Sequence, residues 1–231
     1  MNLQNPKKFK LLMDQAHQVA INVLRPISRK YDKAEHSYPK ELDMLASLVD
    51  GMNEGGEGMN AGAAVGKRGT NEQGNKNGVN LSTALSVIEM CYGDTALLLS
   101  MPRQGLGNSA IAAVANEEQL ERFKNTWAAM AITEPNCGSD SAAIRTTAIK
   151  DGKDYILNGE KIFVTSGERA DAIVVWATLD KKLGRSAIKS FVIPKGTAGM
   201  KVERLEHKLG IKASDTAVIR LIDCRVPANN L

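Results

Sequence analysis

The stretch Met130–Asp140 holds the residue types best suited to ligand chemistry. It reads MAITEPNCGSD, an apolar run that enters a Glu-Pro corner and then a short Gly-Ser-Asp loop. Such a loop can direct backbone N–H groups toward one electron-rich ligand edge, and the hydroxyls of Thr133 and Ser139 add movable donors. A flavin is a ligand of this kind, because its N1–C2=O end gains negative charge when the ring accepts a hydride.

A second stretch, Lys161–Gly167, follows about thirty residues later and reads KIFVTSG. Phe163 offers an aromatic face that can cover a ring system, and Thr165 places a hydroxyl nearby. The same residues also suit an ordinary barrel with a strand, a proline corner and a hairpin. Spacing alone favours that ordinary interpretation over a ligand site.

The first half of the chain is predicted to be helical. Apolar residues recur every three or four positions over 9–24, and Pro26 should kink or end that helix. Further helices are expected from Pro39, over 81–98, over 109–115 and over 117–123. Nine glycines between Gly51 and Gly78 indicate a mobile surface loop or a partly disordered segment.

From Trp127 onward the apolar period changes to two. Short runs rich in Ile, Val, Thr and Tyr predict consecutive strands, and Asp151-Gly152 and Asn158-Gly159 are hairpin signals. The expected strands are 128–133, 143–150, 155–157, 161–165, 172–178, 188–193, 201–205 and 217–222. The predicted fold is α+β and multidomain: an all-α domain over 1–125 followed by an antiparallel β-barrel domain over 126–231.

Composition excludes several other classes. Net charge is +4 with interleaved signs, which argues against a nucleic-acid surface, and the isolated Cys and His residues argue against a metal site. No apolar run is long enough for a membrane span, and the first residues lack a secretory signal, so we expect a cytoplasmic protein. The glycine clusters complete neither a dinucleotide-binding fingerprint nor a P-loop.

Four ordered motifs resemble those of the acyl-CoA dehydrogenase family. Residues 133–140 resemble its TEPxxGSD signature, and 158–165 resemble its NGxKxxIT segment. Residues 208–216 are similar to its LG…SDT segment, and 117–119 to its EEQ helix. The resemblance covers essentially the whole chain.

The resemblance implies FAD as cofactor and acyl-CoA as substrate. Thr133 would bond the isoalloxazine edge, Phe163 would pack on the ring, Thr165 would bond near N5, and Ser139 would also touch the acyl-CoA. The implied cofactor-binding residues are Met130, Ile132, Thr133, Gly138, Ser139, Phe163, Val164 and Thr165. The family carries out α,β-dehydrogenation in fatty acid β-oxidation, passes electrons to an electron-transferring flavoprotein, and forms homotetramers or homodimers.

The segment 214–231 resembles the last strand of the family's middle domain. The family's C-terminal helical bundle, which supplies the catalytic glutamate, would therefore lie beyond Leu231, and no catalytic residue is assigned here. Glu134 is expected to be structural. We expect this chain alone to bind flavin weakly or not at all and to be inactive. The alternatives are a related acyl-CoA oxidase or flavin monooxygenase, or a non-catalytic truncated protein that binds flavin or acyl-CoA.

Overall fold

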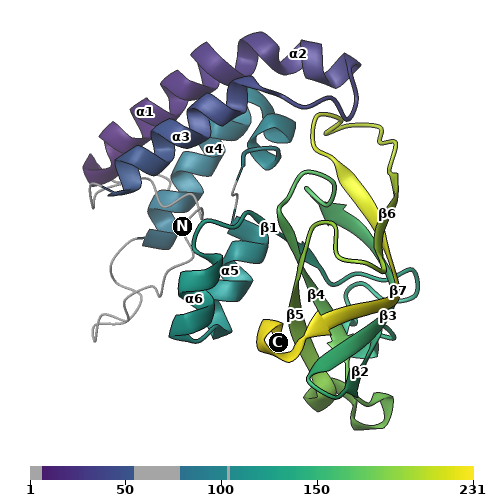
Figure 1. Cartoon of the computed structure of the whole chain (residues 1–231). Coiled ribbons are helices and arrows are strands. Elements are labelled where there is room, and N and C mark those ends of the chain that lie inside the picture. Colours follow the sequence, from purple (N-terminus) through teal and green to yellow (C-terminus); the bar gives the residue numbers. More distant parts are fainter. Residues whose placement is uncertain (1–6, 55–78, 103–104) are drawn as a thin grey trace. The chain divides into compact units, whose positions relative to one another are not determined.

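The computed structural model describes residues 7–54, 79–102 and 105–231, which form two compact units (Figure 1). The helical unit holds 7–54, 79–102 and 208–214, and the β unit holds 105–207 and 215–231. Among the described residues, no helix has the length and apolar character needed to cross a membrane. Most of the predicted Gly51–Gly78 loop lies outside the described residues, and its first four residues are helical.

Apolar positions four residues apart build the core of the helical unit. Ala16, Ala20 and Leu24 share one buried face, and Ala16 and Leu24 pack in a cluster with Leu42 and Leu97. The helix predicted over 9–24 changes to a wider π turn just before Pro26 and then continues, so the proline does not end it. The helical elements are η1 (Lys7–Phe9), α1 (Lys10–Val19), η2 (Ala20–Leu24), α2 (Arg25–Lys33), α3 (Glu41–Glu54) and α4 (Val79–Leu99).

The β unit begins with two helices and continues as a seven-stranded sheet. Its helices are α5 (Gly105–Val114) and α6 (Glu117–Phe123). Its strands are β1 (Ala128–Ala131), β2 (Thr147–Asp151), β3 (Asp154–Thr165), β4 (Ala172–Thr178), β5 (Ile188–Pro194), β6 (Met200–Leu205) and β7 (Thr216–Pro227). Short 3-10 turns are η4 (Ser141–Ala143), η5 (Lys181–Ala187) and η6 (Ala228–Asn230).

The prediction of a purely antiparallel barrel was wrong in part, because the sheet is mixed. β4 pairs in parallel with β1 along Ala172–Val175 and with β2 at Thr178, while the other pairs are antiparallel. After the β2–β3 hairpin the chain returns beside β1 in the same direction, which a run of strands without helices does not reveal. β5 and β6 each pair with one strand, so the described ladder is open and not a closed ring.

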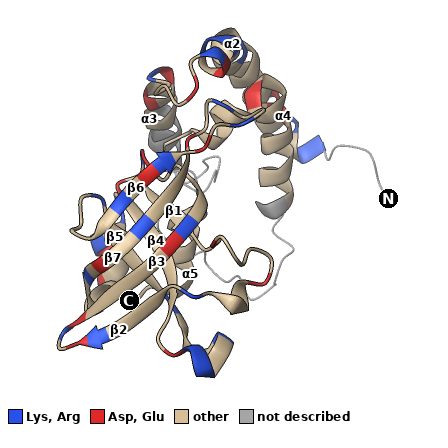
Figure 2. Cartoon of the chain, turned by 90° about the vertical axis from the view of Figure 1, so that its right-hand side faces the viewer, with Lys and Arg blue, Asp and Glu red and all other residues tan. Residues whose placement is uncertain are grey.

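β1 and β2 both lie between β4 and β3, one after the other along these strands. Several of the predicted site residues follow the end of β1. β1 pairs with the start of β4, and β2 meets the end of β4 while pairing with the first half of β3. Basic and acidic residues alternate with other residues along β3, β6 and β7 (Figure 2). Arg220 of β7 pairs with Glu160 of β3, and Arg225 of β7 pairs with Asp151 at the end of β2.

Of the two predicted hairpins, only one is a turn. Asp151 pairs with Asp154 around Gly152, whose φ of 62° suits a tight turn. The prediction of a turn at Asn158-Gly159 was wrong, because these residues lie within β3 at a break in its pairing register with β7. A Cβ on Gly159 would lie 2.4 Å from Thr146 Oγ1, so a close approach of two backbones requires this glycine.

The helices α5 and α6 pack on the sheet of the β unit. Ile111 and Phe123 share a buried cluster with Ala128 of β1 and Val174 of β4. The compact units therefore divide on the N-terminal side of α5. The domain boundary near Asn125 stays a prediction about the family's domains.

Candidate functional site

The loop after β1 is a tight turn that folds back beside Thr133. The backbone N–H of Glu134 donates to the Cys137 carbonyl at 2.9 Å, and the Cys137 N–H donates to the Glu134 carbonyl at 3.2 Å. Gly138 then lies beside Thr133, because a Cβ on Gly138 would be in ordinary van der Waals contact with Thr133 Cγ2, at 3.7 Å. The turn thus places the Gly138–Ser139 backbone next to the Thr133 side chain.

A buried ion pair holds the base of this loop. The Lys161 side chain is fully buried and that of Glu134 is 5% exposed, and Lys161 Nζ lies 2.8 Å from Glu134 Oε1. The same ammonium donates to the Ile132 carbonyl at 3.0 Å. Glu134 also accepts the backbone N–H groups of Arg145 and Thr146 at 2.7 and 2.9 Å.

These contacts oppose the effect of burial on the pKa of both groups. Burial acts to raise the pKa of Glu134, but the hydrogen bonds from Lys161 and the two backbone amides outweigh it and hold that pKa below its ordinary value. Burial lowers the pKa of Lys161, and the Glu134 carboxylate opposes that change. Burial also raises the pKa of the neighbouring Cys137 thiol. A thiol with a raised pKa is a poor nucleophile.

Phe163 stands out of the sheet at a β-bulge. The register of β3 against β7 shifts between Lys161 and Val164, so the side chain of Val164 enters the core while that of Phe163 is 61% exposed. Phe163 has a left-handed φ of 57°, which is unfavourable for a bulky residue. An exposed aromatic ring held in a strained backbone is a marker of functional sites.

The two predicted stretches lie side by side in the β unit. The Ile162 N–H donates to the Thr133 carbonyl at 2.9 Å, which joins the end of β1 to the bulge of β3. The N–H groups of Gly138 and Ser139 make no hydrogen bond to any described residue. The hydroxyls of Thr133, Ser139 and Thr165 are likewise unpartnered there. A set of free donors beside an exposed aromatic ring fits the edge and face of a flavin.

The other predicted cofactor residues differ in what they can offer. Met130 and Ile132 are half-buried along the end of β1, and Gly138 and Ser139 are exposed. The side chain of Val164 belongs to the core of the β unit, so only its backbone can face a ligand.

The sequence assigned Asp215 no role, although the structure shows that it binds the turn directly after Thr165. Asp215 is buried, and its Oδ2 accepts the backbone N–H of Glu168 at 2.9 Å and that of Arg169 at 3.3 Å. Its carbonyl accepts the N–H of Ser166, a residue with a left-handed φ of 60°. Asp215 therefore fixes the turn that follows Thr165. The SDT motif was noticed in the sequence, but nothing local showed which backbone groups the aspartate would bind.

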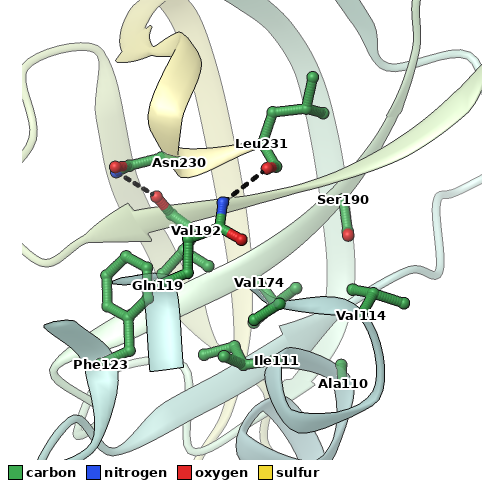
Figure 3. Close-up of a pocket in the computed structure, with 11 residues that line it drawn as sticks. Ala110, Ile111, Val114, Gln119, Phe123, Val174, Ser190, Val192, Asn230 and Leu231 are labelled. Carbon is green, nitrogen blue, oxygen red and sulfur yellow. Dashed lines mark hydrogen bonds between the residues drawn. The ribbon is translucent and has the colours of Figure 1, made fainter. Parts of the chain in front are cut away.

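A pocket elsewhere in the β unit takes no part in this site. It lies between the helices α5 and α6, the strands β4 and β5, and the C-terminal turn (Figure 3). Asn230 donates to the Val192 carbonyl and Gln119 to the Leu231 carbonyl at its rim. None of the predicted site residues lines this pocket.

Comparison with known proteins decides the family. Residues 129–224 match the family described as "acyl-CoA dehydrogenase, middle domain". The whole chain aligns at 32% identity with a short-chain specific acyl-CoA dehydrogenase of Clostridium acetobutylicum, and covers 59% of that protein. The chain belongs to the acyl-CoA dehydrogenase family.

Other members show how wide the family is. An acryloyl-CoA reductase (NADH) of Anaerotignum propionicum is 31% identical over the whole chain, which covers 57% of that protein. A solved glutaryl-CoA dehydrogenase of Mycobacterium smegmatis in complex with FADH2 superposes with a TM-score of 0.75 at 25% identity. The alignment covers 98% of this chain and 55% of that one. This acyl-CoA dehydrogenase family chain thus spans a little under three fifths of the length of these relatives.

Proposed function

We propose that this chain forms the flavin-facing part of an FAD-dependent acyl-CoA dehydrogenase that converts an acyl-CoA to the trans-2-enoyl-CoA. The observation that carries the proposal is Phe163, an exposed ring on a left-handed bulge, beside unpartnered donors at Thr133 and at Gly138 and Ser139. The FADH2 complex of the Mycobacterium smegmatis relative supports FAD as the cofactor.

The proposed roles are those that the family resemblance implies, and the positions of the side chains are compatible with them. Phe163 covers one face of the ring and excludes water from it, while the Thr133 and Thr165 hydroxyls hydrogen-bond its edge. The N–H groups of Gly138 and Ser139 stabilise negative charge at that edge, and the Ser139 hydroxyl also contacts the acyl-CoA. FAD held by these residues would supply a hydride acceptor for the Cβ–H of the thioester, and the proton on Cα would need a separate base.

Glu134 is not proposed as the base for that proton. Its two oxygens accept hydrogen bonds from Lys161, Arg145 and Thr146, and the side chain is buried. A general base needs a free lone pair within reach of the proton that it removes. We propose that the base, the electron-transferring flavoprotein contact and the homotetramer or homodimer interface involve parts of the protein beyond these residues.

Flavin binding is tested by titrating the chain with FAD and following the quenching of flavin fluorescence. We expect weak saturable binding, which Phe163→Ala and Thr165→Val weaken further. Ile222→Ala is the matched control, because Ile222 is 60% exposed in the same unit and lies outside the site. Absence of saturable binding, or equal binding by all four proteins, contradicts the proposal.

The reaction class is tested with the flavin-loaded full-length protein, which includes the proposed base, and a panel of acyl-CoA thioesters. Bleaching of the visible flavin band with reduction of an electron-accepting dye supports dehydrogenation, and oxygen consumption supports an oxidase or monooxygenase.

The name of the acryloyl-CoA reductase relative favours a second candidate, in which an enoyl-CoA is reduced. Oxidation of reduced flavin by an enoyl-CoA, with no bleaching by any acyl-CoA, would support it. A protein that binds flavin but responds to neither ligand is the non-catalytic alternative.

A further inference from the structure

We propose that the buried Glu134–Lys161 pair is the positioning element of the flavin-facing site, which fixes Thr133 relative to Phe163. The inference deepens the proposed function and rests on it for the identity of the ligand. Neither residue of the pair is a catalytic residue in this proposal, because both are buried and bound to protein groups.

The pair and one backbone hydrogen bond attach the loop to β3 at three successive residues. Lys161 Nζ donates to the Ile132 carbonyl and to Glu134 Oε1 at 3.0 and 2.8 Å. Between these two anchors, the Thr133 carbonyl accepts the N–H of Ile162 at 2.9 Å. Thr133 therefore has a bonded residue on each side as well as its own bond, so its backbone, which carries the hydroxyl, cannot shift without breaking one of these contacts.

The same pair also fixes the entrance to β2. The two Glu134 oxygens accept the N–H groups of Arg145 and Thr146, which lie directly before that strand. The carboxylate is thus held by a side chain of β3 and by the backbone before β2, while its own residue belongs to the loop. One buried group consequently joins the three segments that surround the site.

The side chains of the Glu134–Lys161 pair point into the β unit, whereas the proposed ligand-binding groups are exposed or half-buried. Lys161 and Glu134 are buried, whereas Phe163 is exposed and Thr133 is half-buried with an unpartnered hydroxyl. The bulge after Lys161 is what allows Phe163 to point outward two residues beyond a buried lysine. Any change in the position of Lys161 therefore moves the start of the bulge and the ring with it.

A buried ion pair is suited to positioning more than to stabilisation. Desolvation offsets much of the attraction between buried charges, and apolar residues of similar volume often give a fold that is as stable or more stable. Charged hydrogen bonds, however, are satisfied only in one arrangement of their donors and acceptors. The expected role is therefore to select one geometry of the loop, and this role can be separated from stability by mutation.

The experiment compares the single variant Lys161→Met, the double variant Glu134→Leu/Lys161→Met and the control Arg220→Met. Arg220 is the cation of an exposed pair with Glu160 on the neighbouring strand, so its loss removes a similar charge outside the site. Three properties are measured on the intact chain: urea stability, amide hydrogen exchange of 132–140, and FAD affinity by fluorescence quenching.

We expect Lys161→Met to weaken FAD binding about tenfold or more and to accelerate exchange in 132–140 by a similar factor, since loss of a supporting contact loosens a site by this order. The double variant should recover stability, because no unpaired charge remains buried. It should not recover FAD affinity or exchange protection. Arg220→Met should match the wild type in all three measurements.

Several outcomes would overturn the inference. Wild-type affinity and protection in the folded double variant would show that the pair does not position the site. Failure of both pair variants to fold would show that the pair is a folding element, which also contradicts a separable positioning role. If the wild type binds no FAD, the proposed function fails, but the exchange of 132–140 still decides whether the pair holds the loop.

Discussion

Replacing Phe163 should separate the stability of the bulge from its binding function. The left-handed backbone costs an L-residue about 1–2 kcal/mol, and glycine adopts it without that cost. The ring is 61% exposed, so removing it sacrifices the burial of about two fifths of a side chain, or about 1 kcal/mol. The two effects nearly cancel in Phe163→Gly, whose free energy of unfolding should lie within about 1 kcal/mol of the wild type.

Phe163→Ala isolates the backbone part of this estimate, because alanine loses the ring but keeps the left-handed strain. It should be less stable than Phe163→Gly by about 1 kcal/mol, the reverse of the usual order within a strand. Val164→Ala, one residue further, removes a core side chain that is 1% exposed, and should cost about 2 kcal/mol.

Urea unfolding followed by tryptophan fluorescence measures these differences in the β unit. The chain has two tryptophans, Trp127 and Trp176, and both belong to that unit. A Phe163→Ala variant at least as stable as Phe163→Gly would refute the claim of backbone strain. If Phe163→Gly costs as much as Val164→Ala, the ring supports the fold and is not held out for a ligand.

Three further predictions concern residues that stabilise one unit from within: Gly159 and Asp215 in the β unit, and Glu41 in the helical unit. Gly159→Ala should cost about 2 kcal/mol, because its new Cβ would overlap Thr146, and a lowered urea midpoint would show it. Asp215→Ala should cost about 2 kcal/mol by leaving two backbone N–H groups unpaired, and a neutral result would contradict its bracing role. Hydrogen bonds from Lys30, and then from Tyr31, lower the pKa of Glu41 to about 2. The contribution of the ionised Glu41 carboxylate to the free energy of unfolding should therefore be complete above its ordinary pKa of 4.5, and it should be lost as the pH falls toward 2. The stability difference between wild type and Glu41→Gln should shrink over that range, and a constant difference would refute it.

Local sequence patterns predicted the elements better than the connections between them. β4 was predicted with its observed ends, since four consecutive β-branched or aromatic residues from Ile173 leave little alternative. Asp151-Gly152 and Asn158-Gly159 carry nearly the same local signal, yet only the first is a turn. The second dipeptide is drawn into β3 because the Asn158 side chain bonds Asp223 on β7, a partner 65 residues away.

The candidate site was predicted by residue type but not by geometry. Strict alternation along 161–165 would put Phe163 on the same face as Lys161, inside the unit. The extra residue of the bulge reverses this, and its cause is the pairing of β3 with β7, which lies about fifty residues further along the chain. Likewise, the sequence could mark Glu134 as structural, but only the fold shows that its partner is Lys161.

Concavity alone would have directed attention to the pocket beside α5 and α6 (Figure 3). That pocket is lined mainly by residues such as Ile111 and Val174, which belong to the cluster that packs the helices on the sheet, so packing accounts for it. The region of Phe163 and Glu134 differs, because core packing does not explain its strained backbone, its exposed ring or its buried charge pair. A strained backbone around an exposed ring and a buried charge pair each cost free energy that a sequence selected for folding alone would avoid. The two features are neighbours, because the hydrogen bond from Ile162 to Thr133 joins the residue before Phe163 to the residue before Glu134. This proximity is the physical reason for placing the functional site there.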